Sequence, residues 1–185
     1  MSRLRPIPPQ ELDARQQQVY DAITTGPRGL VVDDVGALRG PFDPMLRLPA
    51  VGLPLQEVGA QLRFFGDLPD DIRELTVLVV AREWRCALEW RVHAGFAVAQ
   101  GIPEAAVAAI RRGERPDLAD PRLTLVHDAV REFLDSKRLA ESTYDALRAL
   151  LGETGVVELI LVVGYYAMLG GLLGGLEIGA DWTDQ

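Results

Sequence analysis

The chain has 185 residues, of which 48% are hydrophobic and 25% charged, and its formal net charge is -8 at pH 7. This composition is typical of a globular fold with its own core rather than of a disordered or fibrous chain. The negative charge, with no cluster of basic residues on any expected helix, argues against nucleic acid or an anionic membrane as a partner. The one cysteine cannot form an intramolecular disulfide and no apolar signal segment opens the sequence, so we expect a cytoplasmic protein.

The N-terminal part of the sequence predicts one helix and a long loop. Residues 1–10 contain three prolines and are expected to form an arm, and helix-like apolar spacing follows over residues 11–23. Residues 24–54 hold too many glycines and prolines for a long helix, so they are predicted to form a loop. Loops of that length are commonly functional, and this one could cover a site or wrap a neighbouring subunit.

The middle of the chain predicts the longest helix. A shorter helix is expected to begin at Leu53 or Pro54 and to end near Gly66. Acidic residues and a proline then open a second helix over residues 67–99, whose apolar residues continue up to a glycine stop. Residues 77–80 could form a buried strand by composition, but their position inside this helical stretch makes helix the preferred prediction.

Four further helices are expected in the C-terminal half. They are predicted over residues 103–112, 120–134, 142–151 (or 141–151) and 154–176, with a break at Gly152.

The last of these helices contains eighteen consecutive uncharged residues, 159–176, and by length alone it could cross a membrane. We predict burial in a bundle or subunit interface instead, because no Lys or Arg follows Arg148 to anchor a span and five glycines weaken the helix. Pairs of glycines four residues apart would also let another helix approach closely.

Together these elements predict an all-α protein with a single domain over residues 1–185. Residues 1–52 would form the arm, first helix and loop, and residues 53–180 the helical core.

The chemically suggestive residues are Cys86, Glu89 and His93, which share one face of a helix because they are three and four residues apart. A carboxylate beside an imidazole holds one tautomer and raises its basicity, which gives a proton carrier near neutral pH. The same spacing is also common in contacts that only stabilise a helix, and a cysteine there is equally suited to core packing.

This segment resembles the carboxymuconolactone decarboxylase family, which belongs to the alkylhydroperoxidase-D-like superfamily. Redox members carry Cys-x-x-Cys-x-x-x-His; here Cys86 matches the first cysteine, Glu89 stands at the second, and His93 matches the histidine. The dithiol is absent, and Glu89-Trp90-x-x-His93 looks like the non-redox branch of the family. The resemblance extends through Gly26-Pro27-Arg28-Gly29, Gly40-Pro41-Phe42, Arg63-Phe64, Glu158-Leu159 and Gly164-Tyr165-Tyr166.

The resemblance implies an alkylhydroperoxidase-D-like helical bundle with a long N-terminal loop and a glycine-rich, buried C-terminal helix. It also implies that Glu74 joins the site. On an unbroken helix Glu74 lies about 120° around the axis from the face of Cys86, so it can join only if the helix breaks near residues 82–85 or the pocket is wide. Otherwise Glu74 is an ordinary acidic residue in the first turns of a helix.

Several other residues are weaker candidates for substrate binding. Trp90 could line a pocket wall or pack in the core, and Tyr165 or its neighbour could turn a hydroxyl into the pocket. Arg28 and Arg82 could each bind a substrate carboxylate with two hydrogen bonds. We leave His127 out, because it is equally suited to a surface position and Asp128 is not expected on its face of the helix.

The resemblance and the proton chemistry together favour a cofactor-free lyase that acts on a small, carboxylate-bearing lactone or related unsaturated compound. His93 would donate or accept the proton, Glu89 would orient it, Glu74 would assist the relay, and an arginine would fix the carboxylate. No cofactor is expected, because the conjugated lactone carbonyl can accept the electron pair left by carbon dioxide.

Two other functions stay open from the sequence: a peroxidase or redox sensor that uses Cys86, and a non-catalytic oligomeric binding protein. Metal binding by Glu74, Glu89 and His93 is conceivable, but without a second histidine nearby the ligand set is thin and we expect no metal. The apolar glycine-rich helix and the resemblance both suggest a homo-oligomer, a trimer or a hexamer.

Overall fold

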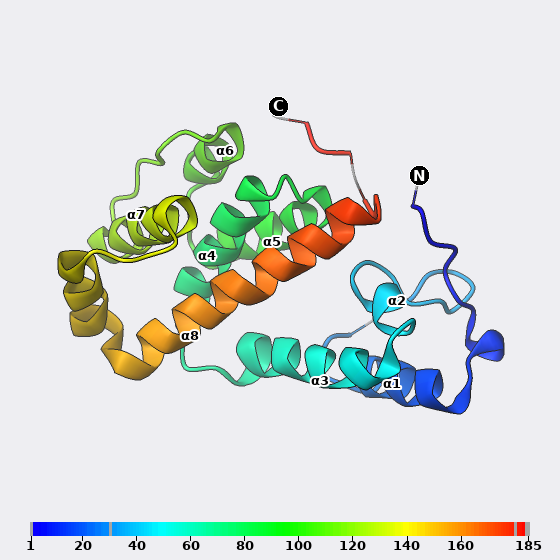
Figure 1. Ribbon diagram of the computed structural model, residues 1–185. Coiled ribbons are helices and arrows are strands. Elements are labelled where there is room, and N and C mark those ends of the chain that lie inside the picture. Colours follow the sequence, from blue (N-terminus) through cyan, green and yellow to red (C-terminus); the bar gives the residue numbers. More distant parts are fainter. Residues whose placement is uncertain (1, 30, 180, 184–185) are drawn as a thin grey trace. The chain divides into compact units, whose positions relative to one another are not determined.

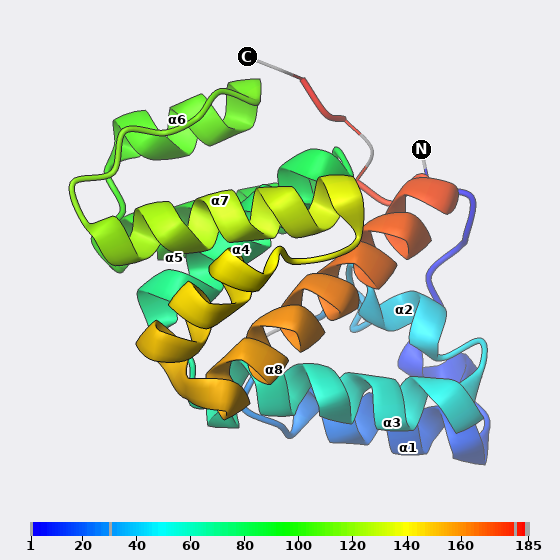
Figure 2. The same cartoon turned by 60° about the vertical axis from the view of Figure 1, so that its left-hand side comes forward.

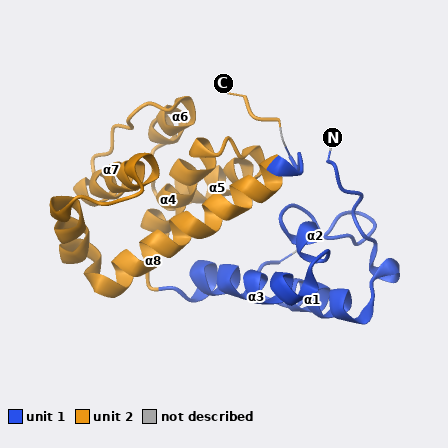
Figure 3. Ribbon diagram, in the orientation of Figure 1, with its two compact units in different colours: residues 1–66, 175–179 blue, residues 67–174, 180–185 orange. Residues whose placement is uncertain are grey.

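The computed structural model describes residues 2–29, 31–179 and 181–183. Within these residues the structure is helical, and the only extended pairing is an isolated antiparallel bridge between Val32 and Leu38. The prediction of an all-α protein is therefore confirmed. Contacts divide the chain into two compact units, residues 1–66 with 175–179 and residues 67–174 with 180–185 (Figure 3). The expected boundary between residues 52 and 53 falls inside a helix, and the single domain over residues 1–185 stays a prediction.

Unit 1 is built from helices of the N-terminal region. They are the 3-10 turn η1 (Pro9–Glu11), α1 (Ala14–Thr24), the short α2 (Phe42–Met45), α3 (Pro49–Ala60) and the π-helical turn η2 (Gln61–Phe65) (Figure 1). The start of α1 is fixed by a capping box, in which the side chain of Asp13 accepts from the backbone of Gln16 and the side chain of Gln16 accepts from the backbone of Asp13. Val19 and Ile23 lie four residues apart and are fully buried, as the predicted first helix required.

The prediction of a loop over residues 24–54 is wrong for the C-terminal part of that range. Helix α3 begins at Pro49, before the predicted start, and α2 lies within the stretch that was expected to be irregular. Proline is well tolerated in the first turn of a helix, so Pro49 opens α3. Pro54 lies inside α3 on its exposed side and does not end it.

Unit 2 places α4 at its centre. Its helices are α4 (Asp70–Glu83), α5 (Ala87–Ala99), α6 (Glu104–Arg112), α7 (Pro121–Ser136) and α8 (Glu141–Gly175), and Figures 1 and 2 show α5, α6 and α7 grouped around α4. Every residue from Ile72 to Ala81 is buried. A helix covered on all sides needs no polar stripe, which explains why residues 77–80 resemble a buried strand by composition and yet are helical.

The predicted single helix over residues 67–99 is two helices. Helix α4 ends at Glu83, Arg85 adopts a left-handed conformation with φ +48°, and the extended Cys86 caps the start of α5. The chain therefore turns between the two helices, and α5 packs beside α4. This is the break near residues 82–85 that Glu74 needs in order to reach His93.

Helix α8 bends at Gly152, whose φ of +71° and ψ of 173° lie outside the helical range, so the predicted break there is confirmed. The carboxylate of Glu158 accepts from the backbone N–H groups of Asp67 at 2.9 Å and Leu68 at 3.1 Å, which ties α8 to the segment before α4. Among the described helices, α8 is long and apolar enough to cross a membrane, but 56% of its most apolar stretch is buried inside the structure. The central helix of a globular core has the same properties.

Candidate active site around His93

A histidine and two carboxylates meet in the interior of unit 2. Nδ1 of His93 lies 2.6 Å from Oε2 of Glu74, and its Nε2 lies 3.5 Å from Oε2 of Glu89. The three residues are almost fully buried, with exposed fractions of 3% for Glu74, 6% for Glu89 and 3% for His93. The imidazole is therefore held between two carboxylates, one at each ring nitrogen.

Two local features of the sequence bring these groups together. Glu89 and His93 are one turn apart on α5, so their side chains lie on the same face. Glu74 comes from α4, and it reaches Nδ1 because the turn at Arg85 folds α5 back against α4. The structure thus brings together the three residues that the sequence predicted as catalytic.

The surroundings of His93 favour the protonated imidazole. Burial is the largest single influence and lowers the pKa of His93, but hydrogen bonds and charge interactions with Glu74 and Glu89 together outweigh it and raise the pKa. A carboxylate at Nδ1 accepts only from an N–H, so the short contact with Glu74 fixes a proton on that nitrogen. The more distant Nε2 is then the nitrogen that can exchange a proton.

Aromatic rings cover the imidazole. Tyr166 packs edge-to-face on His93 with ring centroids 5.1 Å apart, and the ring of Tyr165 meets that of Tyr166 edge-to-face at 5.6 Å. The ring packed on the imidazole is therefore that of Tyr166, and a role of Tyr165 in substrate binding stays a prediction. The ring of Phe96 lies 6.2 Å from that of His93 and is 45% exposed, so it extends from the site to the surface.

Cys86 is buried at the start of α5 and forms no disulfide. Burial is the main cause that raises the pKa of its thiol, and it outweighs the backbone N–H of Glu89, which acts in the opposite direction. A thiol with a raised pKa is a poor nucleophile, so this environment disfavours the peroxidase alternative.

Trp90 takes part in a cluster of aromatic rings with a guanidinium group. Its ring meets that of Trp182 edge-to-face at 5.6 Å, and the guanidinium of Arg111 lies 5.1 Å from the Trp90 ring and 3.5 Å from the Trp182 ring. Trp90 therefore joins α5 to α6 and to the C-terminal segment of unit 2.

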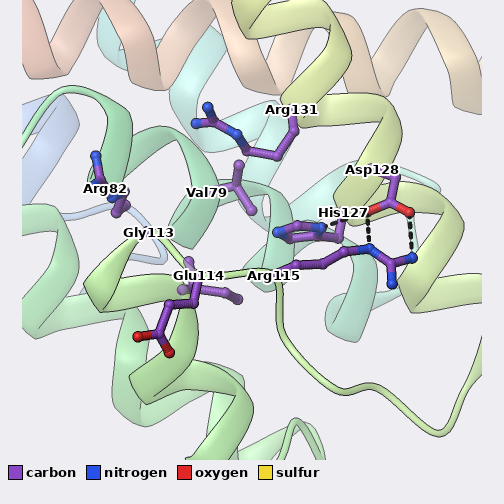
Figure 4. A pocket seen from close by; sticks show the side chains of 9 residues that line it. Val79, Arg82, Gly113, Glu114, Arg115, His127, Asp128 and Arg131 are labelled. Carbon is purple, nitrogen blue, oxygen red and sulfur yellow. Dashed lines mark hydrogen bonds and ion pairs between the residues drawn. The ribbon is translucent and has the colours of Figure 1, made fainter.

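The two arginines predicted to bind substrate lie in different units. Arg28 belongs to unit 1, where its guanidinium donates to the backbone carbonyl of Gln56 at 2.5 Å and lies 5.1 Å from the ring of Phe42. Arg82 lines a pocket of about 340 Å³ in unit 2 (Figure 4). Neither Glu74, Glu89 nor His93 lines this pocket.

The same pocket contains His127, which is not among the site residues predicted from the sequence. His127 is buried, which excludes the surface position that the sequence left open, and its Nδ1 lies 2.9 Å from Oδ1 of Asp128, which was not expected on the same helix face. A sequence signal existed, because His127 lies at helical spacing among apolar residues of α7 that are buried: Leu123, Val126, Val130 and Leu134.

In the part of the chain that the structure describes, no group of three or more His, Cys, Asp or Glu side chains is arranged to hold a metal ion. Glu74 and Glu89 face opposite nitrogens of one imidazole, whereas metal ligands converge on a single point.

No family model matches the sequence, and neither a curated protein nor a solved structure matches it. The resemblance to the carboxymuconolactone decarboxylase family stays a prediction that rests on the motifs quoted above.

Proposed function

We propose that the chain is a cofactor-free lyase that removes carbon dioxide from a small, carboxylate-bearing lactone or related unsaturated compound, as the family resemblance implies. The observation that carries the proposal is the buried imidazole of His93 between two carboxylates, at 2.6 Å and 3.5 Å. Such an arrangement supports proton transfer near neutral pH without a metal or an organic cofactor.

The distances favour an exchange of the roles expected from the sequence. Glu74, at the shorter distance, would hold the Nδ1–H of His93 and orient the ring. Glu89, at the longer distance from Nε2, would leave that nitrogen able to give its proton to the substrate. Glu89 would then assist the relay of a proton from solvent back to Nε2.

The proposed step replaces the carboxylate of the substrate with a proton. The bond between the substrate carbon and its carboxylate breaks, carbon dioxide leaves, and the electron pair moves into the conjugated lactone carbonyl to form an enolate. Nε2–H of the protonated His93 delivers its proton to a carbon of this enolate, which restores the carbonyl. His93 is left neutral and takes up one proton from solvent, so the net change is one proton consumed and one carbon dioxide released.

A path from solvent to the imidazole would pass Phe96, because its ring packs against that of His93 and the residue is partly exposed. Substrate would have to displace this ring, since the imidazole itself is 3% exposed. Phe96→Ala is therefore expected to change KM and to leave the pH dependence of kcat unchanged. Val98→Ala, which alters another exposed apolar side chain of α5, serves as the control.

The direct test is a screen of small unsaturated lactones and carboxylates in which released carbon dioxide is measured. His93→Gln is expected to lower kcat by about 10²–10⁴-fold, the usual contribution of a general acid.

Glu74→Gln should move the alkaline limb of the pH–rate profile to lower pH, because it removes a partner that raises the pKa of His93. Glu153→Gln, an exposed carboxylate of the same unit, is the matched control.

Unchanged turnover in His93→Gln would remove the proposal. Saturable binding of such compounds without release of carbon dioxide would instead point to a non-catalytic binding protein. Peroxide consumption that is lost in Cys86→Ser would point to the peroxidase.

A further inference from the structure

The pocket of Figure 4 is separate from the His93 site. It is formed by α4, α7, the end of α6 and the segment that follows α6, and its volume of about 340 Å³ is within the range of small-molecule sites. The lining residues are Val79, Arg82, Ile110, Gly113, Glu114, Arg115, His127, Asp128 and Arg131.

Two of the three arginines in this pocket have carboxylate partners. Arg115 donates to both oxygens of Asp128, with its Nη2 at 2.7 Å and its Nε at 3.1 Å. Arg131 bridges Glu83 and Asp135, at 2.8 Å and 3.0 Å. Their charges are therefore largely compensated within the protein.

Arg82 differs from these two arginines. Among the residues that the structure describes, no hydrogen bond or ion pair joins its side chain, and its Nε is buried without a partner. Its guanidinium lies against Gly113: a Cβ there would come within 2.4 Å of Nη2, so the missing side chain of Gly113 makes room for the charge. A partly buried guanidinium without an anion carries a desolvation cost that a bound oxyanion would offset.

The opposite side of the pocket offers an imidazole. Nδ1 of His127 is held by Asp128, and Figure 4 shows the other ring nitrogen turned away from Asp128 into the pocket. The hydrogen bond from Arg115 is the main cause that lowers the pKa of Asp128, with a smaller contribution from His127, so this carboxylate is ionised and accepts Nδ1–H. When the ring carries its proton on Nδ1 alone, Nε2 is an acceptor that faces the pocket.

We propose that this pocket binds a small oxyanion, a carboxylate or a phosphate, that also carries a hydroxyl group. The guanidinium of Arg82 would hold the oxyanion, and Nε2 of His127 would accept from the hydroxyl. The proposal is independent of the decarboxylase proposal, because the two sites share no residue.

The chain has two histidines, so NMR of the imidazole nitrogens can follow both sites at once. The signals are assigned with His127→Gln, and the protein is titrated at constant ionic strength with lactate, with propionate and with inorganic phosphate. Propionate differs from lactate by the absence of one hydroxyl. We expect saturable shifts of His127 and not of His93, and tighter binding of lactate than of propionate.

Arg82→Gln is expected to weaken lactate binding by about tenfold or more, because it removes a charged hydrogen-bond donor. Arg82→Lys should retain part of the affinity, since it keeps the charge and loses the planar fork. Arg138→Gln removes the same charge from an exposed position of unit 2 outside the pocket, and it should leave binding unchanged. Circular dichroism of each variant checks that the helices are intact.

Three results would overturn the proposal: shifts of His127 that do not saturate with any probe, equal weakening by Arg82→Gln and Arg138→Gln, or equal affinities for lactate and propionate. Saturable, Arg82-dependent binding of phosphate that exceeds that of lactate would support it and identify phosphate-bearing compounds as the ligand class.

Discussion

Protonation of His93 is coupled to folding, because the ring is buried beside two carboxylates in the folded chain and is solvated in the unfolded chain. The buried charge of the imidazole is stabilised by the two carboxylates, and the imidazole in turn stabilises their charges. Removing the imidazole would take a hydrogen-bonded partner away from each of two buried carboxylates, and breaking a buried pair of this kind costs about 3–5 kcal/mol.

This coupling predicts a pH-dependent stability difference between the wild type and His93→Gln. The folded-state pKa of His93 is raised, so its contribution to the unfolding free energy is fully present below the unfolded-state pKa of about 6.5. It is lost as the pH rises through the raised folded-state pKa. Urea denaturation at a series of pH values should therefore show a difference that shrinks toward alkaline pH.

Arg138→Gln is the control for that series, because this exposed side chain should give a difference that is small and constant across the same range. A wild-type advantage that grows with pH would contradict the arrangement of His93 between the two carboxylates.

A second prediction concerns Cys86. Its thiol is buried and has a raised pKa, so little thiolate is present at neutral pH. A thiol reagent should label the folded protein at least about tenfold more slowly than the protein unfolded in urea. Equal rates would show that the thiol is accessible, and would return the peroxidase alternative to consideration.

The candidate site was only partly predictable from the sequence. The spacing of Glu89 and His93 on one helix face follows from sequence alone. The approach of Glu74 depends on a left-handed conformation at Arg85, and a non-glycine residue gives no sequence signal for such a turn. The position of Glu74 in the site came from the family resemblance, together with the condition that the helix breaks.

The helices themselves were predicted best where a strong start signal was present. Prolines and acidic residues placed the beginnings of α4, α6 and α7 to within a few residues. The same rule failed for α3. Pro54 is predicted as the start of a helix, but α3 begins at Pro49 and Pro54 lies inside it. A proline indicates where a helix can begin, and tertiary packing decides which proline is used.

The glycines of α8 predict two substitutions with opposite effects. A Cβ at Gly170 would lie 2.7 Å from Cβ of Trp84, an atom fixed by the backbone at the end of α4, so Gly170→Ala should destabilise unit 2 by about 1–3 kcal/mol. A Cβ at Gly164 would meet no atom within 4 Å, so Gly164→Ala should stabilise by about 0.5–1 kcal/mol through helix propensity. Thermal unfolding of the two variants measures both, and the same sign for both would refute the packing of Trp84 on α8.

For the molecule as a whole, the division into two units had no signal in the sequence. Composition does not change at Gly66, and residues 175–179, the end of α8 and the segment after it, join unit 1 although the rest of α8 belongs to unit 2. Contacts between distant segments define such a division, and spacing within one segment does not reveal them.

The homo-oligomer, a trimer or a hexamer, stays a prediction, and α8 offers a way to test it. Large apolar side chains on one side of this helix are exposed, namely Val157, Ile160, Leu161 and Met168. Contiguous exposed apolar side chains are a common mark of subunit contacts. Sedimentation velocity should show three or six times the mass of a single chain, and Leu161→Glu should reduce it. A monomer in the wild type would exclude the prediction.

The tryptophans are distributed unevenly between the two units. Trp84, Trp90 and Trp182 all belong to unit 2, and the chain has no others. Indole emission during denaturation therefore reports unit 2 alone, whereas far-ultraviolet circular dichroism reports the helices of both units. If the transitions seen by the two probes coincide, the two units unfold together in one cooperative step. If they are separated, each unit has a stability of its own.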